Sequence, residues 1–487
     1  MADRVRQLLR NEVTWLLSAL LVGTVLRCWN LSAASLNSDE AFSFALGSLP
    51  LQQLPALLAG TDFHPPLFYA LTHALLVSVP KPRWDYRVVS VLFGMTTIVA
   101  TWGAARRMLG PLVASLAAVA VALQPALIQY DRTYRMYALV VALVTLSFWL
   151  LVEAQAAVGR RRLWLLAGYA CVAVALVYTY YLCALVLAVQ LCYALTRRPI
   201  VWEVVGAQAI AVVAFLPWLP VMLRQLPLGG LALTRPGLDA GLTASVANAF
   251  AAGLPEGWLG WSNALLPALA VGAVIVVGGW VARGSALPFW LGVLPLQVVL
   301  SIALSKNLAY FPRYLLMDVP ALCIAFAAII AMLSDQRRAV AAAALALGGL
   351  IVGLVASFNV LFDPYYQFPD WYAINAVMLQ RATPGDAVVL DAGYERLVVQ
   401  DYTAFRRRDM AVFMNPGDFK PVLAFAARHA HARIWYLEHQ HFYWDPQRRI
   451  AAALSAQRRV LFLQRWPHHD KANDVTLILF DRAGAMP

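Results

Sequence analysis

The chain has 487 residues, of which 61% are hydrophobic and 13% are charged, about half the charged share of a typical soluble domain. This composition excludes a disordered chain and an ordinary cytosolic enzyme, and it indicates a polytopic membrane protein. The formal net charge of +12 does not indicate nucleic-acid binding, because the arginines lie in short turns between apolar runs and form no basic face. The five cysteines lie in or beside apolar segments and predict no disulfide framework.

Membrane-spanning helices are expected where an apolar run approaches the roughly 20 residues needed to cross the hydrocarbon core. The first candidate is followed by no small-residue cleavage site, so we expect an anchor and not a cleaved signal peptide. The candidate segments are 13–29, 65–79, 86–105, 111–128, 136–157, 163–178, 180–196, 200–222, 262–282, 286–304, 313–333 and 338–360.

Arginine-rich turns predict the side of the membrane on which each loop lies, because basic loops stay in the cytoplasm. If all twelve segments crossed, the N-terminal arginines and Arg106 would lie on opposite sides. Segment 65–79 is only 15 residues long, begins with two prolines and contains His73. We therefore expect it to be a juxtamembrane or re-entrant helix at the outer interface. The prediction is about eleven spans, with a cytoplasmic N-terminus and an external C-terminus.

Two domains are expected. Residues 1–360 form the predicted helical membrane domain, with outer loops at 30–85 and 223–261. Residues 361–487 are more polar and predict a small extracytoplasmic α/β domain. Its expected strands are Ala387–Leu390, Ile434–Leu437 and Val475–Phe480, with helices near 370–381 and 420–430.

Acidic and histidine side chains are concentrated in the first outer loop. Asp39 and Glu40 follow the first span, and adjacent carboxylates at a membrane surface need a task or a partner. One interpretation is a helix start capped by Ser38, with both carboxylates in the first turn. The other is a catalytic pair. His64, before two prolines, is either an interfacial residue in an extended turn or part of the same site.

Cations on the outer side form a second candidate group. Arg135 and Arg313 enter apolar segments, where an unpaired charge costs several kcal/mol. Snorkelling, or pairing of Arg135 with Asp131, accounts for them without a ligand. The alternative is that they converge on an anion at the outer leaflet, such as a lipid phosphate. The outward candidates are Arg87, Tyr134, Arg135, Lys306, Tyr310 and Arg313.

Histidines are frequent in the polar tail, where His439 and His441 share one face of a predicted strand. Surface histidines and a metal site are both compatible with this pair, but no third ligand stands at a useful spacing. The sequence contains no phosphate-binding glycine loop, dinucleotide fingerprint or HExxH motif. Chemistry on soluble nucleotides therefore has no support.

Several of these motifs, taken in chain order, resemble the family 39 glycosyltransferases of the GT-C superfamily. The resemblance covers about residues 12–360, and relatives include protein O-mannosyltransferases and bacterial aminoarabinose transferases of lipid A. The tail also fits the family, although more loosely, since many bacterial members end in a small extracytoplasmic domain. The motifs are Asp39-Glu40, the His-Pro-Pro-Leu-Phe-Tyr segment 64–69, Arg87, the Tyr-x-Arg-x-x-Tyr type of turn at 130–137, and Phe-x-Arg-Tyr-Leu at 311–315.

The resemblance implies an inverting transfer of a sugar from a polyprenyl-phosphate donor to a hydroxyl acceptor at the outer face of a bacterial cytoplasmic membrane. By position, Asp39 matches the family's general base, with Glu40 beside it. Asp318, five residues after Arg313, departs from the apolar pattern expected there and would weaken the role of Arg313 by pairing with it. The implied donor-phosphate ligands are Arg87, Arg135, Lys306 and Arg313, and the implied cleft-lining residues are His64, Tyr69, Tyr134 and Tyr310.

Two other classes of protein compete with this interpretation. A transporter or flippase of lipid-linked sugars would place ionisable groups near the membrane midplane in paired repeats, and the sequence shows no repeat. A non-catalytic scaffold would use the tail as a binding module. No cofactor is required by the implied chemistry, and no motif supports a divalent cation. The expected partners are the lipid-linked donor, membrane lipids and an acceptor that is a lipid, a glycan or a protein, with no nucleic acid.

Overall fold

The computed structural model forms two compact units. Unit 1 comprises Met1–Leu31 and Gly47–Leu361, and unit 2 comprises Ser32–Leu46 and Phe362–Pro487. Unit 2 thus includes part of the first outer loop, Ser32–Leu46, which the sequence had assigned to the membrane domain. The structure describes residues 11–79, 86–197, 201–225, 250, 265–303, 312–335, 338–391, 395–398, 410–412, 420–439, 441, 445, 447–468 and 474–484.

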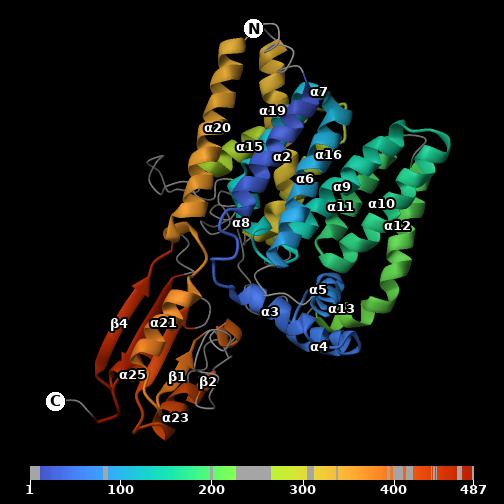
Figure 1. The fold of residues 1–487 in the computed structure, drawn as a ribbon. Coiled ribbons are helices and arrows are strands. Elements are labelled where there is room, and N and C mark those ends of the chain that lie inside the picture. Colours follow the sequence, from blue (N-terminus) through green and yellow to red (C-terminus); the bar gives the residue numbers. More distant parts are fainter. Residues whose placement is uncertain are drawn as a thin grey trace. The chain divides into compact units, whose positions relative to one another are not determined.

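The described residues of unit 1 form helices joined by turns, with no strand among them (Figure 1). Its main breaks follow from proline: Pro125 begins a new helix directly after α7, and Pro312 begins the short turn before α19. The helices are α2 (Glu12–Cys28), α4 (Leu54–Thr61), α5 (Leu67–Ser78), α6 (Arg87–Leu109), α7 (Pro111–Ala122), α8 (Pro125–Asp131), α9 (Tyr137–Ala156), α10 (Gly159–Thr179), α11 (Cys183–Leu195), α12 (Val201–Phe215), α13 (Leu219–Gln225), α15 (Leu265–Val281), α16 (Leu287–Leu291), α17 (Val293–Ala303), α18 (Pro312–Leu315), α19 (Val319–Asp335) and α20 (Ala339–Phe362).

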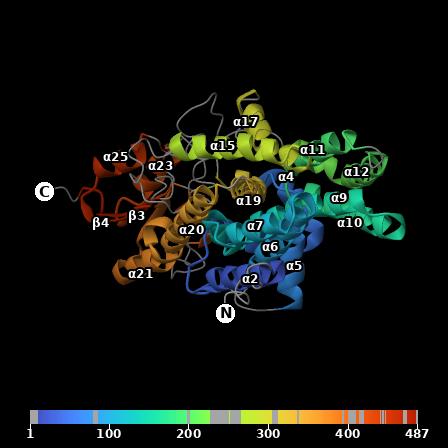
Figure 2. The same cartoon turned by 90° about the horizontal axis from the view of Figure 1, so that it is seen from above.

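The centre of unit 1 is built on α6, which contacts α2, α7 and α9 (Figures 1 and 2). Small residues permit this close packing, as is usual between helices in membranes. Ala100 and Ala104 are almost fully buried. A side chain added at Gly103 would overlap the indole ring of Trp149 on α9. The small side chains of α6 therefore allow the neighbouring helices to approach it closely.

Six described helices are long and apolar enough to cross a membrane, or up to eight helices if each of two bent pairs is one span. The prediction of about eleven spans is therefore not confirmed. One predicted span, 111–128, is broken into α7 and α8, which are bent by 58°. Segment 65–79 contains α5, whose 12 residues extend about 18 Å, well short of the ~30 Å hydrocarbon core. Its length agrees with a helix that does not cross.

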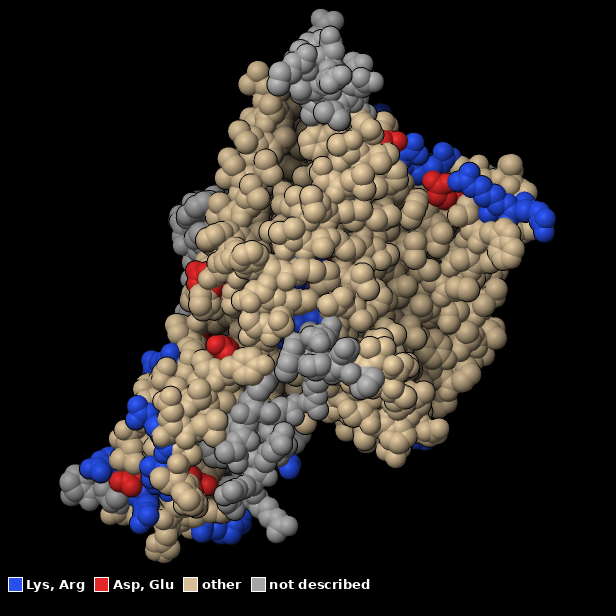
Figure 3. Space-filling view, viewed as in Figure 1, with Lys and Arg blue, Asp and Glu red and all other residues tan. Residues whose placement is uncertain are grey.

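Charged side chains are sparse on the visible face of the helices in unit 1 (Figure 3). Where α9 passes into α10, Arg161 lies 3.0 Å from Glu153 and Arg162 lies 2.7 Å from Glu203. These ion pairs border an apolar surface, as expected at a membrane boundary. The sequence predicts this basic turn to be cytoplasmic.

Unit 2 contains a five-stranded sheet with the order β2-β1-β3-β5-β4. Strand β1 pairs in parallel with β2 and β3, whereas β5 is antiparallel to both β3 and β4. The sequence predicted β1, β3 and β5 as strands and missed β2 and β4. The strands are β1 (Ala387–Leu390), β2 (Met410–Val412), β3 (Ile434–His439), β4 (Val460–Trp466) and β5 (Val475–Phe480), and the helices are α3 (Ser38–Gly47, up to Leu46 in this unit), α21 (Trp371–Arg381), α23 (Lys420–Arg428) and α25 (Arg449–Ser455).

Both faces of the sheet are covered, which explains why its central strands are continuously apolar. Val388 and Trp435 face one cluster, which also contains Trp371 of α21. Val389 and Tyr436 alternate to the opposite face, against α23 and α25. The two clusters form the core of unit 2.

A labelling experiment tests the predicted sidedness. Val158, 82% exposed between α9 and α10, and Arg459, exposed in unit 2, would each be replaced by cysteine. We expect an impermeant maleimide to reach position 459 only from outside the cell and position 158 only after the cytoplasmic face is opened. Labelling of both positions from the same side would contradict the predicted topology.

Candidate functional site

Helix α3 begins with a capping box. The Asn37 Oδ1 atom accepts a hydrogen bond from the Glu40 backbone N–H at 2.9 Å, and Glu40 Oε2 accepts one from the Asn37 N–H at 3.0 Å. These reciprocal bonds satisfy two backbone donors that a helix start leaves open. The sequence had suggested Ser38 as the cap, and Asn37 takes that place. The reason is the spacing of three between Asn37 and Glu40, which suits a reciprocal pair.

The capping box separates the two neighbouring carboxylates. Glu40 is fully buried and its carboxylate serves the backbone of the first turn. Asp39 is half-buried, and its backbone carbonyl accepts a hydrogen bond from Ser43 Oγ at 2.9 Å. Of the predicted catalytic pair, Asp39 is therefore the carboxylate that remains accessible.

A buried acid–imidazole pair lies in unit 1 between α4 and α5. Asp62 Oδ1 is 2.8 Å from His64 Nδ1, and Asp62 Oδ2 accepts a hydrogen bond from the Tyr69 hydroxyl. Burial raises the pKa of Asp62, but His64, Arg135 and the hydrogen bonds from His64 and Tyr69 outweigh it and lower the pKa to about 2. Asp62 is thus ionised and can only accept, so the proton at this contact belongs to His64 Nδ1.

The second ring nitrogen of His64 is thereby left for another partner. Among the residues that the structure describes, the buried Nε2 atom of His64 has no hydrogen-bond partner. The ring lies between Phe63 and Tyr180, with centroid distances of 4.3 and 5.9 Å. Gln225 donates to the His64 carbonyl at 3.2 Å and fixes the turn from α13. In its neutral form, this imidazole can accept a hydrogen bond from a hydroxyl group through Nε2.

Two predicted cations lie near aromatic side chains or backbone carbonyls in unit 1. The Arg135 guanidinium lies 5.7 Å from the centre of the Tyr69 ring, and its charge acts on Asp62. Arg87 donates to the Leu31 carbonyl at 3.0 Å. Both arginines are almost fully buried. The structure thus brings together three predicted site residues, His64, Tyr69 and Arg135. It adds Asp62, which the sequence analysis had not selected.

The other predicted residues are distributed differently. Tyr134 donates to Thr72 Oγ1 at 3.2 Å and packs between aromatic rings. Arg313 lies 5.6 Å from the Tyr314 ring centre. Asp318 is buried, and neither carboxylate oxygen has a hydrogen-bond partner among the described residues. The suggested pairing of Arg313 with Asp318 is therefore not observed. Lys306 and Tyr310 lie outside the described residues.

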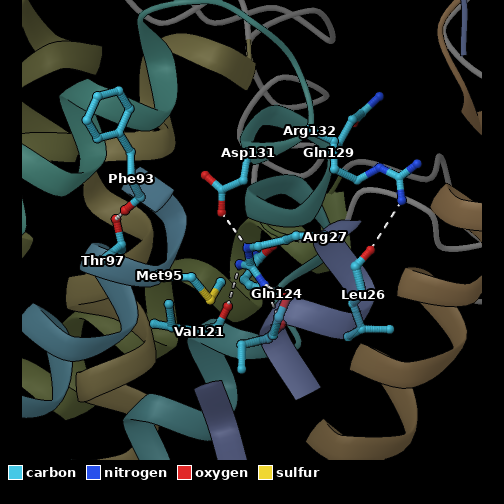
Figure 4. Close-up of polar contacts among 12 residues, drawn as sticks. Leu26, Arg27, Phe93, Met95, Thr97, Val121, Gln124, Gln129, Asp131 and Arg132 are labelled. Atoms are coloured by element: carbon cyan, nitrogen blue, oxygen red, sulfur yellow. Dashed lines mark hydrogen bonds and ion pairs between the residues drawn. The ribbon is translucent and has the colours of Figure 1, made fainter. Parts of the chain in front are cut away.

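Asp131 is paired, but not with Arg135. It accepts a hydrogen bond from Arg27 Nε at 2.7 Å, and both side chains are buried (Figure 4). Arg27 also donates to the carbonyls of Ala122 at 3.0 Å and Val121 at 3.3 Å, where α7 ends. It thus satisfies the Ala122 carbonyl, which loses its helical partner at the break before α8 because the Ala126 N–H bonds to Gln124 Oε1. Sequence reasoning missed this pair, although an arginine at the end of an apolar span signals the need for one.

The same polar cluster anchors the turn that carries the predicted cation Arg135. Arg132 follows Asp131 and donates to the Leu26 carbonyl at 3.2 Å, on the helix that contains Arg27 (Figure 4). Arg135 lies three residues further along. Two arginine contacts to α2 therefore hold the start of the 130–137 turn.

Metal ligands do not cluster in the described part of the chain. No group of three or more His, Cys, Asp or Glu side chains there is arranged to hold a metal ion. Of the two histidines considered from sequence, His439 contacts Glu395 at 2.6 Å and His441 lies 3.6 Å from Glu438. Each histidine thus lies near one carboxylate of unit 2.

Part of the chain is similar to a known protein family. The family model of dolichyl-phosphate-mannose-protein mannosyltransferases matches residues 63–223. The match contains His64, Tyr69, Arg87 and Arg135, and it begins after Asp39. No curated protein matches the sequence at a significant level.

Solved structures extend the likeness over nearly the whole chain. ArnT from Cupriavidus metallidurans in the apo state matches with a TM-score of 0.53 and 14% identity, covering 96% of this chain and 97% of that one. The archaeal oligosaccharyltransferase AglB from Archaeoglobus fulgidus, in complex with an inhibitory peptide and a dolichol-phosphate, matches with a TM-score of 0.53 and 11% identity, covering 98% and 75%. The chain therefore shares the fold of ArnT and AglB. The resemblance found in the sequence is confirmed at this level.

A glycine substitution tests the importance of the Arg27–Asp131 pair. A side chain at Gly94 would overlap the Asp131 carboxylate and press on Arg27. We expect Gly94→Ala to destabilise the protein by about 3 kcal/mol, because it separates a buried ion pair, and to lower its melting temperature in detergent. Gly206→Ala is the control, since its added methyl group meets no atom. Equal melting temperatures for the two variants would show that the pair contributes nothing.

Proposed function

We propose that this chain is an inverting glycosyltransferase that moves a hexose or pentose from a polyprenyl-phosphate donor to a hydroxyl acceptor. The reaction would take place at the outer face of a bacterial cytoplasmic membrane. The GT-C fold and the family match support the class of enzyme. The bound dolichol-phosphate in AglB supports a polyprenyl-phosphate donor by analogy.

The observation that carries the proposal is the difference in accessibility between the Asp39 and Glu40 carboxylates. An inverting displacement needs one base to take the proton from the attacking hydroxyl, and no second carboxylate for a covalent intermediate. Glu40 is occupied in the capping box, whereas Asp39 is half-buried and accessible. Asp39 is therefore the proposed general base, and Glu40 shapes the turn that carries it.

The leaving group is a phosphate, whose growing negative charge needs cations and hydrogen-bond donors. Arg87, Arg135 and Arg313 of unit 1, together with Lys306, are the proposed ligands. Fixed guanidinium groups in a site with little water stabilise such charge strongly. The Arg135 guanidinium lies 5.7 Å from the centre of the Tyr69 ring, and the Tyr69 hydroxyl donates to Asp62. This arrangement places a cation at the site before the donor binds. His64 and Tyr69 are proposed to line the site beside it.

A cavity of about 610 Å³ in unit 1 suits the lipid part of the donor. Its walls come from α7, α15, α19 and α20 and are almost entirely apolar. Gln124 is an exception, and its side chain is bound to Phe250 O and Ala126 N. A lining without available polar groups matches an isoprenoid chain, which offers none.

Two substitutions at the start of α3 test the base. Asp39→Asn is expected to lower kcat about 10²- to 10⁴-fold, the usual value of a general base. Glu40→Gln keeps an oxygen for the capping box and should retain most of the activity. The assay is transfer in detergent from a panel of undecaprenyl-phosphate sugars. Wild-type turnover by Asp39→Asn, or a greater loss in Glu40→Gln, would refute the assignment.

The lipid cavity can be tested without knowing the sugar. Gly353 lines the cavity, and a side chain there makes only ordinary contacts with Leu123. Gly353→Leu should weaken binding of undecaprenyl phosphate several-fold but leave binding of a short isoprenyl phosphate unchanged. Gly348→Leu, on the exposed side of the same helix, is the control. Equal affinity of both variants for the long lipid would exclude this cavity.

A further inference from the structure

Helix α3 is built into the core of unit 2. Ala41 is almost fully buried in the same apolar cluster as Trp371 and Trp435. Just before the helix, Ser35 Oγ accepts a hydrogen bond from the Trp371 backbone N–H at 2.9 Å and donates to Pro369 O at 3.4 Å. The segment that carries Asp39 is therefore fixed at its start and along one face by residues more than 300 positions further along the chain.

Ser38, the residue before Asp39, has a polar anchor of its own. Since Asn37 caps the helix, the Ser38 hydroxyl is available elsewhere, and it lies 2.8 and 2.7 Å from the two carboxylate oxygens of Glu395. Glu395 is fully buried and also contacts His439 Nδ1 at 2.6 Å. The His439 backbone N–H is held in turn by Asp391 Oδ1 at 2.8 Å. Ser38, Glu395 and His439 form what we term the anchor cluster.

The anchor cluster is a costly way to hold two segments together. It lies beside an apolar core, where Trp371 packs edge-on against the His439 ring at 5.8 Å. Packed hydrophobic residues of similar volume stabilise a core as well as a buried polar or ionic group does, or better. What directional bonds add is a defined orientation. The single O–H of Ser38, shared between the two carboxylate oxygens of Glu395, restrains the first turn of α3 next to the side chain that would act as base.

We propose that the anchor cluster is a positioning device for Asp39, through which the C-terminal α/β unit sets the direction of the catalytic carboxylate. The inference rests on the proposed role of Asp39 as general base. Ser38, Glu395 and His439 are positioning residues, since they act through Asp39. The C-terminal unit then belongs to the catalytic apparatus.

The test replaces the hydroxyl and then restores it. Ser38→Ala should lower kcat at least 10-fold with little change in the KM for an undecaprenyl-phosphate sugar, because orientation of the base is lost while donor binding is kept. Ser38→Thr retains the hydroxyl and should restore most of the rate. The control is Glu438→Gln. Glu438 is also a buried carboxylate and lies on the same strand as His439, but it pairs with Arg448 and does not belong to the anchor cluster. It should leave kcat unchanged.

A double-mutant cycle separates positioning from general stability. In an Asp39→Asn background, Ser38→Ala should cause no further loss of the residual rate. A further 10-fold loss, or equal activity of Ser38→Ala and Ser38→Thr, would overturn the positioning role and leave the base intact. Wild-type turnover by Asp39→Asn alone would instead overturn the proposed base, and the positioning role with it.

Discussion

The first turn of helix α3 treats its two neighbouring carboxylates differently. A fully buried carboxylate that already accepts the backbone N–H of a capping residue is out of reach of a substrate hydroxyl. Glu40 is held in this way by Asn37. The acidic pair that looks symmetrical in the sequence is therefore divided by its hydrogen bonds, and Asp39 is left as the accessible carboxylate.

Both units contain buried charged side chains that are paired. In unit 1, Arg27 is paired with Asp131 and also satisfies the end of α7, and Asp62 is paired with His64. In unit 2, Glu395 is paired with His439. Each pair replaces lost hydration by directional contacts. Two of these pairs contact the proposed site: His64 is a proposed lining residue, and Glu395 binds Ser38, the residue before Asp39.

The sequence predicted what depends on local pattern. Apolar β-branched runs predicted β1, β3 and β5, and the apolar segment 65–79 predicted a helix, which is α5. Strand β4 was missed because its residues are exposed or half-buried along an edge. The cap was placed one residue late because Asn and Ser are both favourable there. Only the spacing to Glu40 distinguishes them.

Contacts between distant segments could not be predicted in this way. Arg27 and Asp131 are 104 positions apart, and Ser38 and Glu395 are 357 apart. Asp131 had instead been considered as a partner for Arg135, which lies only four residues away. The inclusion of α3 in the C-terminal unit had no signal in composition or periodicity. Such pairings depend on how the chain closes on itself, which sequence pattern alone does not specify.

The stereochemistry of transfer tests the central claim most directly. A polyprenyl-phosphate sugar of defined anomeric configuration would be given to the enzyme, and the configuration of the product would be measured by NMR. A single accessible base predicts inversion at the anomeric carbon. Retention would require a second carboxylate as nucleophile, and it would contradict the assignment of Glu40 to the capping box and of Asp39 as the sole base.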